Sequence, residues 1–169
     1  MVINTKKVYC AGINTNRGLI VLELDPKLAP NTVNNFVFLA QQGFYDNLTW
    51  HRVIPDFVAQ TGDPSGTGAG GPGYTVPLEV SPKIKYDRPG RVGVARSQSP
   101  DSAGSQFFIT YTPQPGLDPN SQSQGYTIIG QVVEGMEVVR QITPFEADKN
   151  PSGRGDPLVS VRVVDLGRR

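Results

Sequence analysis

The stretch WHRVIPDFVAQ, residues 50–60, decides how this chain can fold. Its apolar side chains alternate with polar ones, which is the period of two that is typical of a β-strand. If its first part is a strand, Trp50 and Arg52 point to one face while His51 and Val53 point to the other. We therefore expect strands here rather than a helix.

The same stretch carries a candidate ligand site. The guanidinium of Arg52 and the amide of Gln60 lie among Ile54, Phe57 and Val58. Small-ligand pockets usually have apolar walls with a few polar groups, so these residues could line one. The alternative is an edge strand whose arginine forms a surface ion pair, because exposed arginines are common. Spacing alone favours this second interpretation.

Outward from this stretch, most apolar segments are short, alternate in the same way and are separated by clusters of Gly, Pro, Asn, Asp and Ser. Many short strands with such turns are typical of a sandwich or a barrel. The expected strands cover residues 18–24, 49–53, 57–61, 90–95, 105–110, 126–133 and 158–166.

Two segments have helical spacing instead. In 30–42, four apolar residues from Val33 to Ala40 fall at i, i+3, i+4 and i+7, with a proline near the start and a glycine just past the end. A second, shorter helix is expected at 135–142. Together these patterns predict a closed sheet whose open ends are plugged by two helices, in a single domain over residues 1–169.

Composition excludes several kinds of chemistry. The chain has 169 residues, one cysteine, one histidine and a formal net charge of +1. Zinc sites use about three or four protein ligands, so Cys10 and His51 cannot build one, and we expect no metal and no cofactor. A single cysteine also excludes an intramolecular disulfide framework. The near-neutral charge gives no general attraction to nucleic acid or to a membrane, so we expect neither as a partner.

The N-terminal residues 1–18 lack the apolar core of a signal peptide. No apolar run approaches the ~18 residues of a membrane span. We therefore expect a cytoplasmic protein, and an export signal upstream of the given sequence remains an open alternative.

Two familiar motifs in the sequence have simpler explanations. The segment GDPSGTGAGGPG, residues 62–73, matches G-x-G-x-x-G, but a proline and a strand-like TVPLEV follow it instead of the helix that a dinucleotide site requires. A Ser-His-Asp triad would need His51 as its base, and the chain has no G-x-S-x-G elbow. The sequence favours a glycine-rich loop and a strand histidine.

A second dense stretch, SQFFIT, covers residues 105–110. Under strand alternation Gln106 and Phe108 share a face. Ordinary core packing by a phenylalanine explains this stretch equally well, so it does not name a function by itself.

Taken together, these stretches resemble the cyclophilin family of peptidyl-prolyl cis-trans isomerases, in the form of its bacterial branch. The resemblance implies a closed eight-stranded antiparallel β-barrel capped by two α-helices, with the substrate groove on the outer face of the barrel. It also implies isomerisation of X-Pro bonds during protein folding, with proline-containing peptides and unfolded or folding proteins as partners. The segments that carry it are residues 29–74, RPGRVGVARS, SAGSQFFIT, GLD and YTIIGQVVEGMEVV.

Carried over residue by residue, the resemblance implies a complete site. Arg52 matches the catalytic arginine of the family, and Phe57, Gln60 and Phe108 are expected to act with it. The residues expected to bind substrate are Val58 and Leu117 in the proline pocket, Ile54 at its edge, Tyr126 at its rim, Gln106 on the peptide backbone, and Ala95, Arg96 and Ser97 beside the residues that precede proline.

Several positions depart from the family's pattern. Gly116 stands where many members have a tryptophan that is associated with binding cyclosporin, so we expect that inhibitor to bind weakly. Val58, Arg96 and Tyr126 replace a methionine, an asparagine and a histidine, and the loop 119–125 is a few residues longer than usual. Since Tyr126 still offers an apolar wall and a hydroxyl, catalysis is less affected than inhibitor binding.

The expected chemistry follows from the X-Pro bond itself. Its partial double-bond character makes uncatalysed exchange slow, on a scale of tens to hundreds of seconds. In the twisted transition state the prolyl nitrogen can accept a hydrogen bond, so a fixed guanidinium at Arg52 would stabilise that state selectively. The competing interpretation is a proline-peptide binding module or holdase chaperone with little isomerase activity. Without heptads or a long apolar edge, we expect a monomer.

Overall fold

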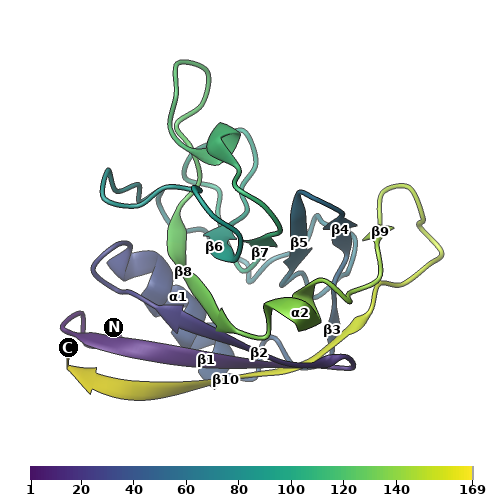
Figure 1. The fold of residues 1–169 in the computed structure, drawn as a ribbon, viewed down its shortest axis with the longest axis horizontal. Coiled ribbons are helices and arrows are strands. Elements are labelled where there is room, and N and C mark those ends of the chain that lie inside the picture. Colours follow the sequence, from purple (N-terminus) through teal and green to yellow (C-terminus); the bar gives the residue numbers. More distant parts are fainter. Residues whose placement is uncertain (169) are drawn as a thin grey trace.

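The computed structural model describes residues 1–168, and its strands form one curled antiparallel sheet (Figure 1). Helix α1 covers Pro30–Gln41, helix α2 covers Met136–Val139, and a short 3-10 turn, η1, covers Pro115–Leu117. The strands are β1 (Lys7–Thr15), β2 (Gly18–Leu24), β3 (Leu48–Thr49), β4 (Arg52–Ile54), β5 (Val58–Thr61), β6 (Arg91–Val94), β7 (Phe107–Thr110), β8 (Ile128–Glu134), β9 (Phe145–Glu146) and β10 (Pro157–Arg168).

The fold is mainly β with two helices, as predicted, but the expected closed eight-stranded barrel is wrong. Ten strands follow the order β3-β10-β1-β2-β8-β6-β7-β5-β4-β9, and within residues 1–168 the end strands β3 and β9 do not pair with each other. The predicted strand 49–53 is split, because the backbone leaves the ladder at Trp50 and His51. There the Trp50 N–H donates to the Asp156 carbonyl at 2.9 Å, and the Ala147 N–H donates to the His51 carbonyl at 3.0 Å. Irregular backbone therefore spans the seam where a barrel would close.

The sequence patterns also miss β1 and β9. In β1 the buried Ala11 and Ile13 alternate with small or polar residues, so the apolar signal of this strand is weak. Strand β9 has only two residues, which pair with Arg52 and Val53 of β4. Two residues are too few for a periodic pattern to be recognised.

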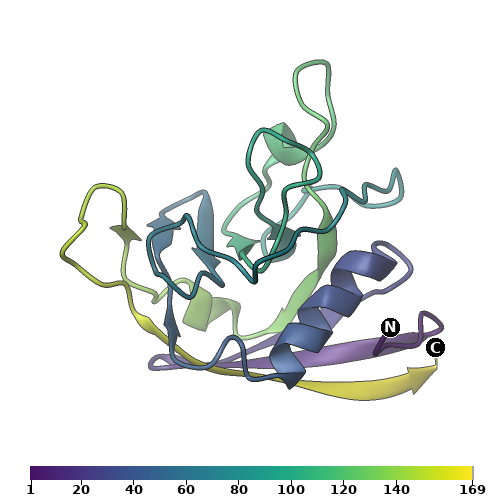
Figure 2. The same cartoon turned by 180° about the vertical axis from the view of Figure 1, so that it is seen from behind.

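Helix α1 confirms its prediction, and it crosses the open side of the curled sheet (Figure 2). The ring of Phe36 lies 5.2 Å from that of Phe107 on β7 and 5.3 Å from that of Tyr45, which ties the helix to the inner face of the sheet. Helix α2 is shorter than the expected 135–142 and follows Gly135, whose φ of 89° starts the turn.

Alternation along β7 separates the core from the outer face of the sheet. Phe107 is 1% exposed and packs edge-on against Trp50, which is fully buried in the core. Its neighbour Phe108 belongs to a separate small apolar cluster with Val58 and Tyr86. The outer face of β4, β5, β7 and β6 is therefore where the candidate site residues gather.

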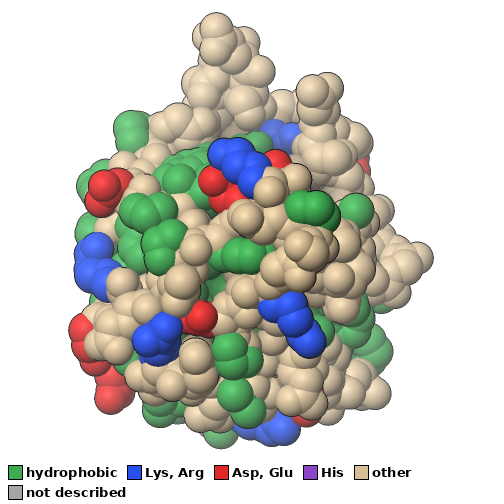
Figure 3. All heavy atoms as spheres, turned by 90° about the vertical axis from the view of Figure 1, so that its right-hand side faces the viewer, with side chains coloured by type: hydrophobic (Ala, Val, Ile, Leu, Met, Phe, Trp, Pro, Cys, Tyr) green, Lys and Arg blue, Asp and Glu red, His purple; other side chains and the backbone are tan. Residues whose placement is uncertain are grey.

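No helix within the described residues 1–168 is long and apolar enough to span a bilayer. On the face at the β9 side of the molecule, basic and acidic side chains are interspersed among hydrophobic ones (Figure 3). That face carries no broad field of one sign.

Candidate functional site

The site begins with a row of residues that lie opposite one another on four neighbouring strands. Arg52 of β4 pairs with Gln60 of β5, Gln60 pairs with Phe108 of β7, and Phe108 pairs with Gly93 of β6. Residues directly opposite in antiparallel strands project to the same face of the sheet. Register alone therefore places a guanidinium, an amide and a phenyl ring side by side.

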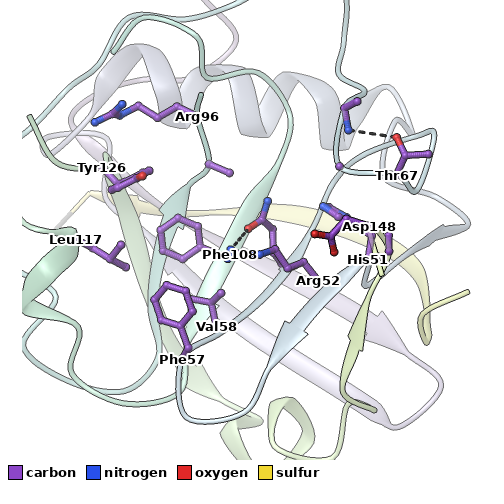
Figure 4. Close-up of a pocket in the computed structure, with 15 residues that line it drawn as sticks. His51, Arg52, Phe57, Val58, Thr67, Arg96, Phe108, Leu117, Tyr126 and Asp148 are labelled. Atoms are coloured by element: carbon purple, nitrogen blue, oxygen red, sulfur yellow. Dashed lines mark hydrogen bonds between the residues drawn. The ribbon is translucent and has the colours of Figure 1, made fainter. Parts of the chain in front are cut away.

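Arg52, Gln60 and Phe108 of this row line a hollow of about 440 Å³, which we call the main pocket (Figure 4). Phe57, Val58, Phe108 and Leu117 gather on one side of it, and Arg52 lies on the other beside His51 and Asp148. The size and the apolar wall suit a small ring held by a few polar groups. Its lining residues are His51, Arg52, Phe57, Val58, Gln60, Thr67, Gly68, Ala69, Ala95, Arg96, Phe108, Leu117, Tyr126, Ala147 and Asp148.

The Phe108 ring is fixed by its neighbours. It stacks on Tyr86 with centroids 5.9 Å apart and meets Tyr126 edge-on at 6.2 Å. A Cβ added at Gly93 would collide with the Tyr86 hydroxyl and with the end of the Phe108 ring. The glycine opposite the ring is therefore what allows it to lie flat on the sheet.

The guanidinium of Arg52 is held over the pocket without an acidic partner. Its Nη1 donates to Gln60 Oε1 at 3.4 Å, and its Cζ lies 5.6 Å from the Phe57 ring centroid. Among residues 1–168 no ion pair involves this arginine, so the surface ion pair of an edge strand is not what it forms. A half-buried cation with N–H groups left for a ligand is the result.

A series of side-chain amide hydrogen bonds connects Arg52, through Gln60 and Gln106, to the glycine-rich loop. Gln60 Nε2 donates to Gln106 Oε1 at 3.0 Å, and Gln106 Nε2 donates to the carbonyls of Gly68 and Gly70, each at 2.9 Å. The Gln60 amide is therefore oriented by Gln106, and the Gln106 amide is oriented by the loop carbonyls. The glycine-rich loop thus sets the position of Gln60, which in turn contacts the guanidinium.

That loop is built around a buried carboxylate. Asp63 is 1% exposed, and it accepts backbone N–H groups from Ser65 at 2.8 Å, Gly68 at 2.6 Å and Gly70 at 3.1 Å. Burial alone would raise the pKa of Asp63, but the hydrogen bond from the Ser65 hydroxyl and those from the backbone N–H groups together lower the pKa overall. The loop wraps its own aspartate, which explains its glycines without a nucleotide.

His51 lies on the same side as Arg52, contrary to the alternation expected for 49–53. The backbone is irregular at Trp50 and His51, so the period of two is lost and Trp50 enters the core instead. His51 is 2% exposed, lines the main pocket and, within residues 1–168, has no hydrogen-bond partner on either ring nitrogen. Burial lowers its pKa, although Asp63 opposes that shift.

Two further hollows adjoin the main pocket and take up other expected residues. The second hollow, of about 540 Å³, is lined by Gln106 and Ser97, and the third, of about 630 Å³, also includes Ser97. Arg96 lines all three. Of the expected residues only Ile54 lies outside these hollows: it is half-buried and pairs with Val58.

Sequence reasoning missed several residues of the main pocket. Thr67, Gly68 and Ala69 come from the glycine-rich loop, and Ala147 and Asp148 come from the long irregular segment after β9. Long loops in a compact domain are often functional, so the length of these segments was the one sequence feature that pointed to them. No local pattern tells which loop residue faces a pocket, because the sheet register decides it.

A curled antiparallel sheet with two helices, whose outer face carries an apolar pocket beside a fixed guanidinium, defines a cyclophilin-like protein. The chain belongs to the cyclophilin-type peptidyl-prolyl cis-trans isomerase family, since the family model described as "Cyclophilin type peptidyl-prolyl cis-trans isomerase/CLD" matches residues 10–167. The family predicted from the sequence is therefore confirmed.

Individual relatives agree with this membership. A Bacillus subtilis protein named peptidyl-prolyl cis-trans isomerase B is 42% identical over 144 residues, covering 85% of this chain and 90% of that protein. A Synechococcus elongatus peptidyl-prolyl cis-trans isomerase is 42% identical over 155 residues, covering 90% and 94%. A Cryptosporidium parvum cyclophilin matches with a TM-score of 0.80 and 32% identity over 93% of this chain and 98% of its own, and it has also been crystallised in the presence of the dipeptide Ala-Pro.

Proposed function

We propose that this chain is a peptidyl-prolyl cis-trans isomerase in which Arg52 stabilises the twisted X-Pro bond. The observation that carries the proposal is the placement of the Arg52 guanidinium, which forms no ion pair among residues 1–168, beside an apolar pocket in a chain that belongs to the cyclophilin family. The reaction needs neither a covalent intermediate nor a proton transfer, only rotation about one bond.

The apolar side of the main pocket would hold the proline ring of the substrate. Phe57, Phe108 and Leu117 offer ring faces and a branched side chain to a pyrrolidine ring, which has no N–H to satisfy. The amides of Gln60 and Gln106 would hold the peptide backbone on one side of the rotating bond. One side of that bond is then anchored while the other side turns.

Arg52 would stabilise the twisted transition state more than the planar ground state. Conjugation is lost as the bond twists, and the prolyl nitrogen gains a lone pair that can accept an N–H from the guanidinium. An acceleration of ~10⁶-fold corresponds to about 8 kcal/mol of selective stabilisation. Preorganisation of the donor by Gln60 supports this role, because a donor that is already positioned costs no reorganisation during the reaction.

The test is exchange of a short Ala-Pro peptide followed by NMR with substoichiometric protein. Catalysis broadens the cis and trans resonances of the peptide, and the Arg52→Ala variant should lose most of that broadening while still binding. Binding without any catalysed exchange in the wild-type protein would overturn the proposal and favour the alternative, a proline-peptide binding module or holdase chaperone.

We also propose that cyclosporin binds weakly and that the protein is a monomer. Gly116 is exposed, and it offers no side chain to an inhibitor at the pocket edge beside Leu117. The outer edge of β10 carries Arg162, Asp165 and Arg168, and charges on an edge strand discourage pairing with another chain. Titration with cyclosporin and sedimentation velocity test these two points.

A further inference from the structure

Arg96 stands where the three hollows of the outer face meet. It follows β6 and lines the main pocket, the second hollow and the third hollow (Figure 4). Its Cζ lies 4.6 Å from the ring centroid of Tyr126, whose ring meets Phe108 of the main pocket. Whatever extends from the apolar pocket toward the second or third hollow passes this guanidinium.

The guanidinium is fixed in place by uncharged acceptors alone. Nε donates to the Gly125 carbonyl at 2.9 Å, Nη1 donates to the carbonyls of Ser97 at 2.9 Å and Gln98 at 3.3 Å, and Nη2 donates to Ser123 Oγ at 3.4 Å. A guanidinium has five N–H donors, so one Nη2 donor has no partner among these four bonds. The side chain is held rigidly, and its charge is not neutralised.

No carboxylate offsets that charge. Among residues 1–168, Arg96 takes part in no ion pair, and it is the one charged residue that lines the second or the third hollow. Asp148 lies on the opposite side of the main pocket (Figure 4). Within the described residues Arg96 is therefore a cation with no carboxylate beside it, whereas Asp148 lies across the pocket next to Arg52.

We propose that Arg96 makes this enzyme prefer proline sites that carry a nearby acidic side chain, an aspartate or a glutamate within three residues of the proline. The inference rests on the proposed isomerase function and adds a substrate class to it. A carboxylate accepts the free Nη2 donor and meets a cation whose position is already fixed, which reduces the entropy lost on binding.

The distance from the apolar pocket to Arg96 is short enough for a residue near the proline to span. From the Phe108 centroid to the Tyr126 centroid is 6.2 Å, and from there to the guanidinium carbon is 4.6 Å. An extended peptide advances ~3.3–3.6 Å per residue. A side chain that starts one to three residues from a proline in the apolar pocket can therefore place its carboxylate at Arg96.

The test compares proline peptides that differ only in one residue, Glu or its uncharged isostere Gln, placed in turn at each of the three positions on either side of the proline. The catalysed rate per mole of enzyme is measured by NMR exchange with wild type, Arg96→Gln and Arg96→Lys. Lys27→Gln is the matched control, because Lys27 is exposed, lines none of the three hollows and loses the same unit of charge.

We expect wild type to process the Glu peptide about threefold to fivefold faster than the Gln peptide at one or more positions, the range of a partly exposed ion pair, and the ratio to fall with added salt. Arg96→Gln should bring the ratio to one, and Lys27→Gln should retain it. Arg96→Lys should retain only part of it, because an ammonium keeps the charge but cannot form the bonds that fix the guanidinium. A ratio of one at every position in wild type, or a preference that survives Arg96→Gln, overturns the inference. Catalysis of the Gln peptides by wild type reports on the proposed function separately.

Discussion

Phe108 lies directly opposite Gly93 in the register of β7 and β6, and the absent side chain of that glycine is the space in which the phenyl ring rests. Tyr86 fills the remaining room beneath the ring. The apolar side of the pocket thus depends on a residue that contributes no atoms to it.

Gly93→Ala tests this dependence. The new methyl group would collide with the Tyr86 hydroxyl and the end of the Phe108 ring, so the ring must move. Overpacking of this kind costs about 1–3 kcal/mol of unfolding free energy. We expect weaker binding of an Ala-Pro peptide in calorimetry and a lower midpoint in urea. Unchanged affinity would contradict the role assigned to Gly93.

Arg52→Ala tests the arginine itself. Loss of a contact made only in the transition state lowers turnover more than binding, so we expect a fall in turnover of roughly 10²-fold with a smaller change in peptide affinity. Arg168→Ala, which removes an exposed arginine at the far end of β10, is the control and should keep full activity. Near-normal turnover of Arg52→Ala would rule out its assigned role.

Asp63→Asn tests the support of the amide chain. An amide in place of the carboxylate turns one acceptor oxygen into a donor that faces backbone N–H groups of the loop, at a cost of about 1–3 kcal/mol. The loop carbonyls that orient Gln106 should shift, and turnover should fall although the residue touches no substrate. Glu137→Gln, at the exposed position of the partly buried helix α2, should change neither turnover nor stability. If Asp63→Asn lost stability but kept full turnover, the loop would be structural only.

His51 predicts a dependence of stability on pH. Burial lowers its pKa below the ordinary value of 6.5, so on acidification the unfolded chain takes up this proton before the folded protein does. Its contribution is full above about pH 6.5 and is lost as the pH falls toward the lower folded pKa, at no more than ~1.4 kcal/mol per pH unit. Urea unfolding between pH 7.5 and 5 measures this loss, and His51→Gln should remove it. As the sole histidine, its ring signals in NMR report its pKa directly, and a midpoint at or above 6.5 would contradict the prediction.

Gly116→Trp tests the proposed weakness toward cyclosporin. A Cβ added at Gly116 meets nothing within 4 Å, so an indole can be accommodated next to Leu117. Burying that aromatic surface against an apolar ligand should tighten cyclosporin binding by about tenfold or more. Gly116→Ser is the control for the loss of the glycine itself. Equal affinities of the two variants would show that this position does not govern inhibitor binding.

Much of the fold could be predicted because it depends on local patterns. Helix α1 shows its buried face through the spacing from Val33 to Ala40, and β2 and β10 show strand alternation. The open seam of the sheet could not be predicted, since it depends on contacts between residues far apart in sequence, such as the hydrogen bond from the Trp50 N–H to the Asp156 carbonyl. The resemblance to the family predicted a closed barrel, but within residues 1–168 the strands β3 and β9 at the two ends of the sheet do not pair with each other.

Some residues of the site could also be predicted from the sequence, and others could not. Motifs placed Arg52, Gln60 and Phe108 together because these residues lie in recognisable stretches, and the sheet register brings them into one row. His51 was misplaced because alternation fails where the backbone leaves the strand. Asp148 carries no local signal, since its position at the pocket follows from the path of the loop after β9.

The buried position of Trp50 gives this protein an internal optical reporter. It is the single tryptophan in the chain, it is shielded from water, and it lies against Phe107 on the core side of the sheet, away from the ring of Phe108. Its emission should therefore shift to longer wavelength when the protein unfolds and stay nearly constant when a peptide occupies the outer face. Fluorescence can therefore follow stability without interference from ligand in every variant above except Gly116→Trp, which adds a second tryptophan at the pocket edge.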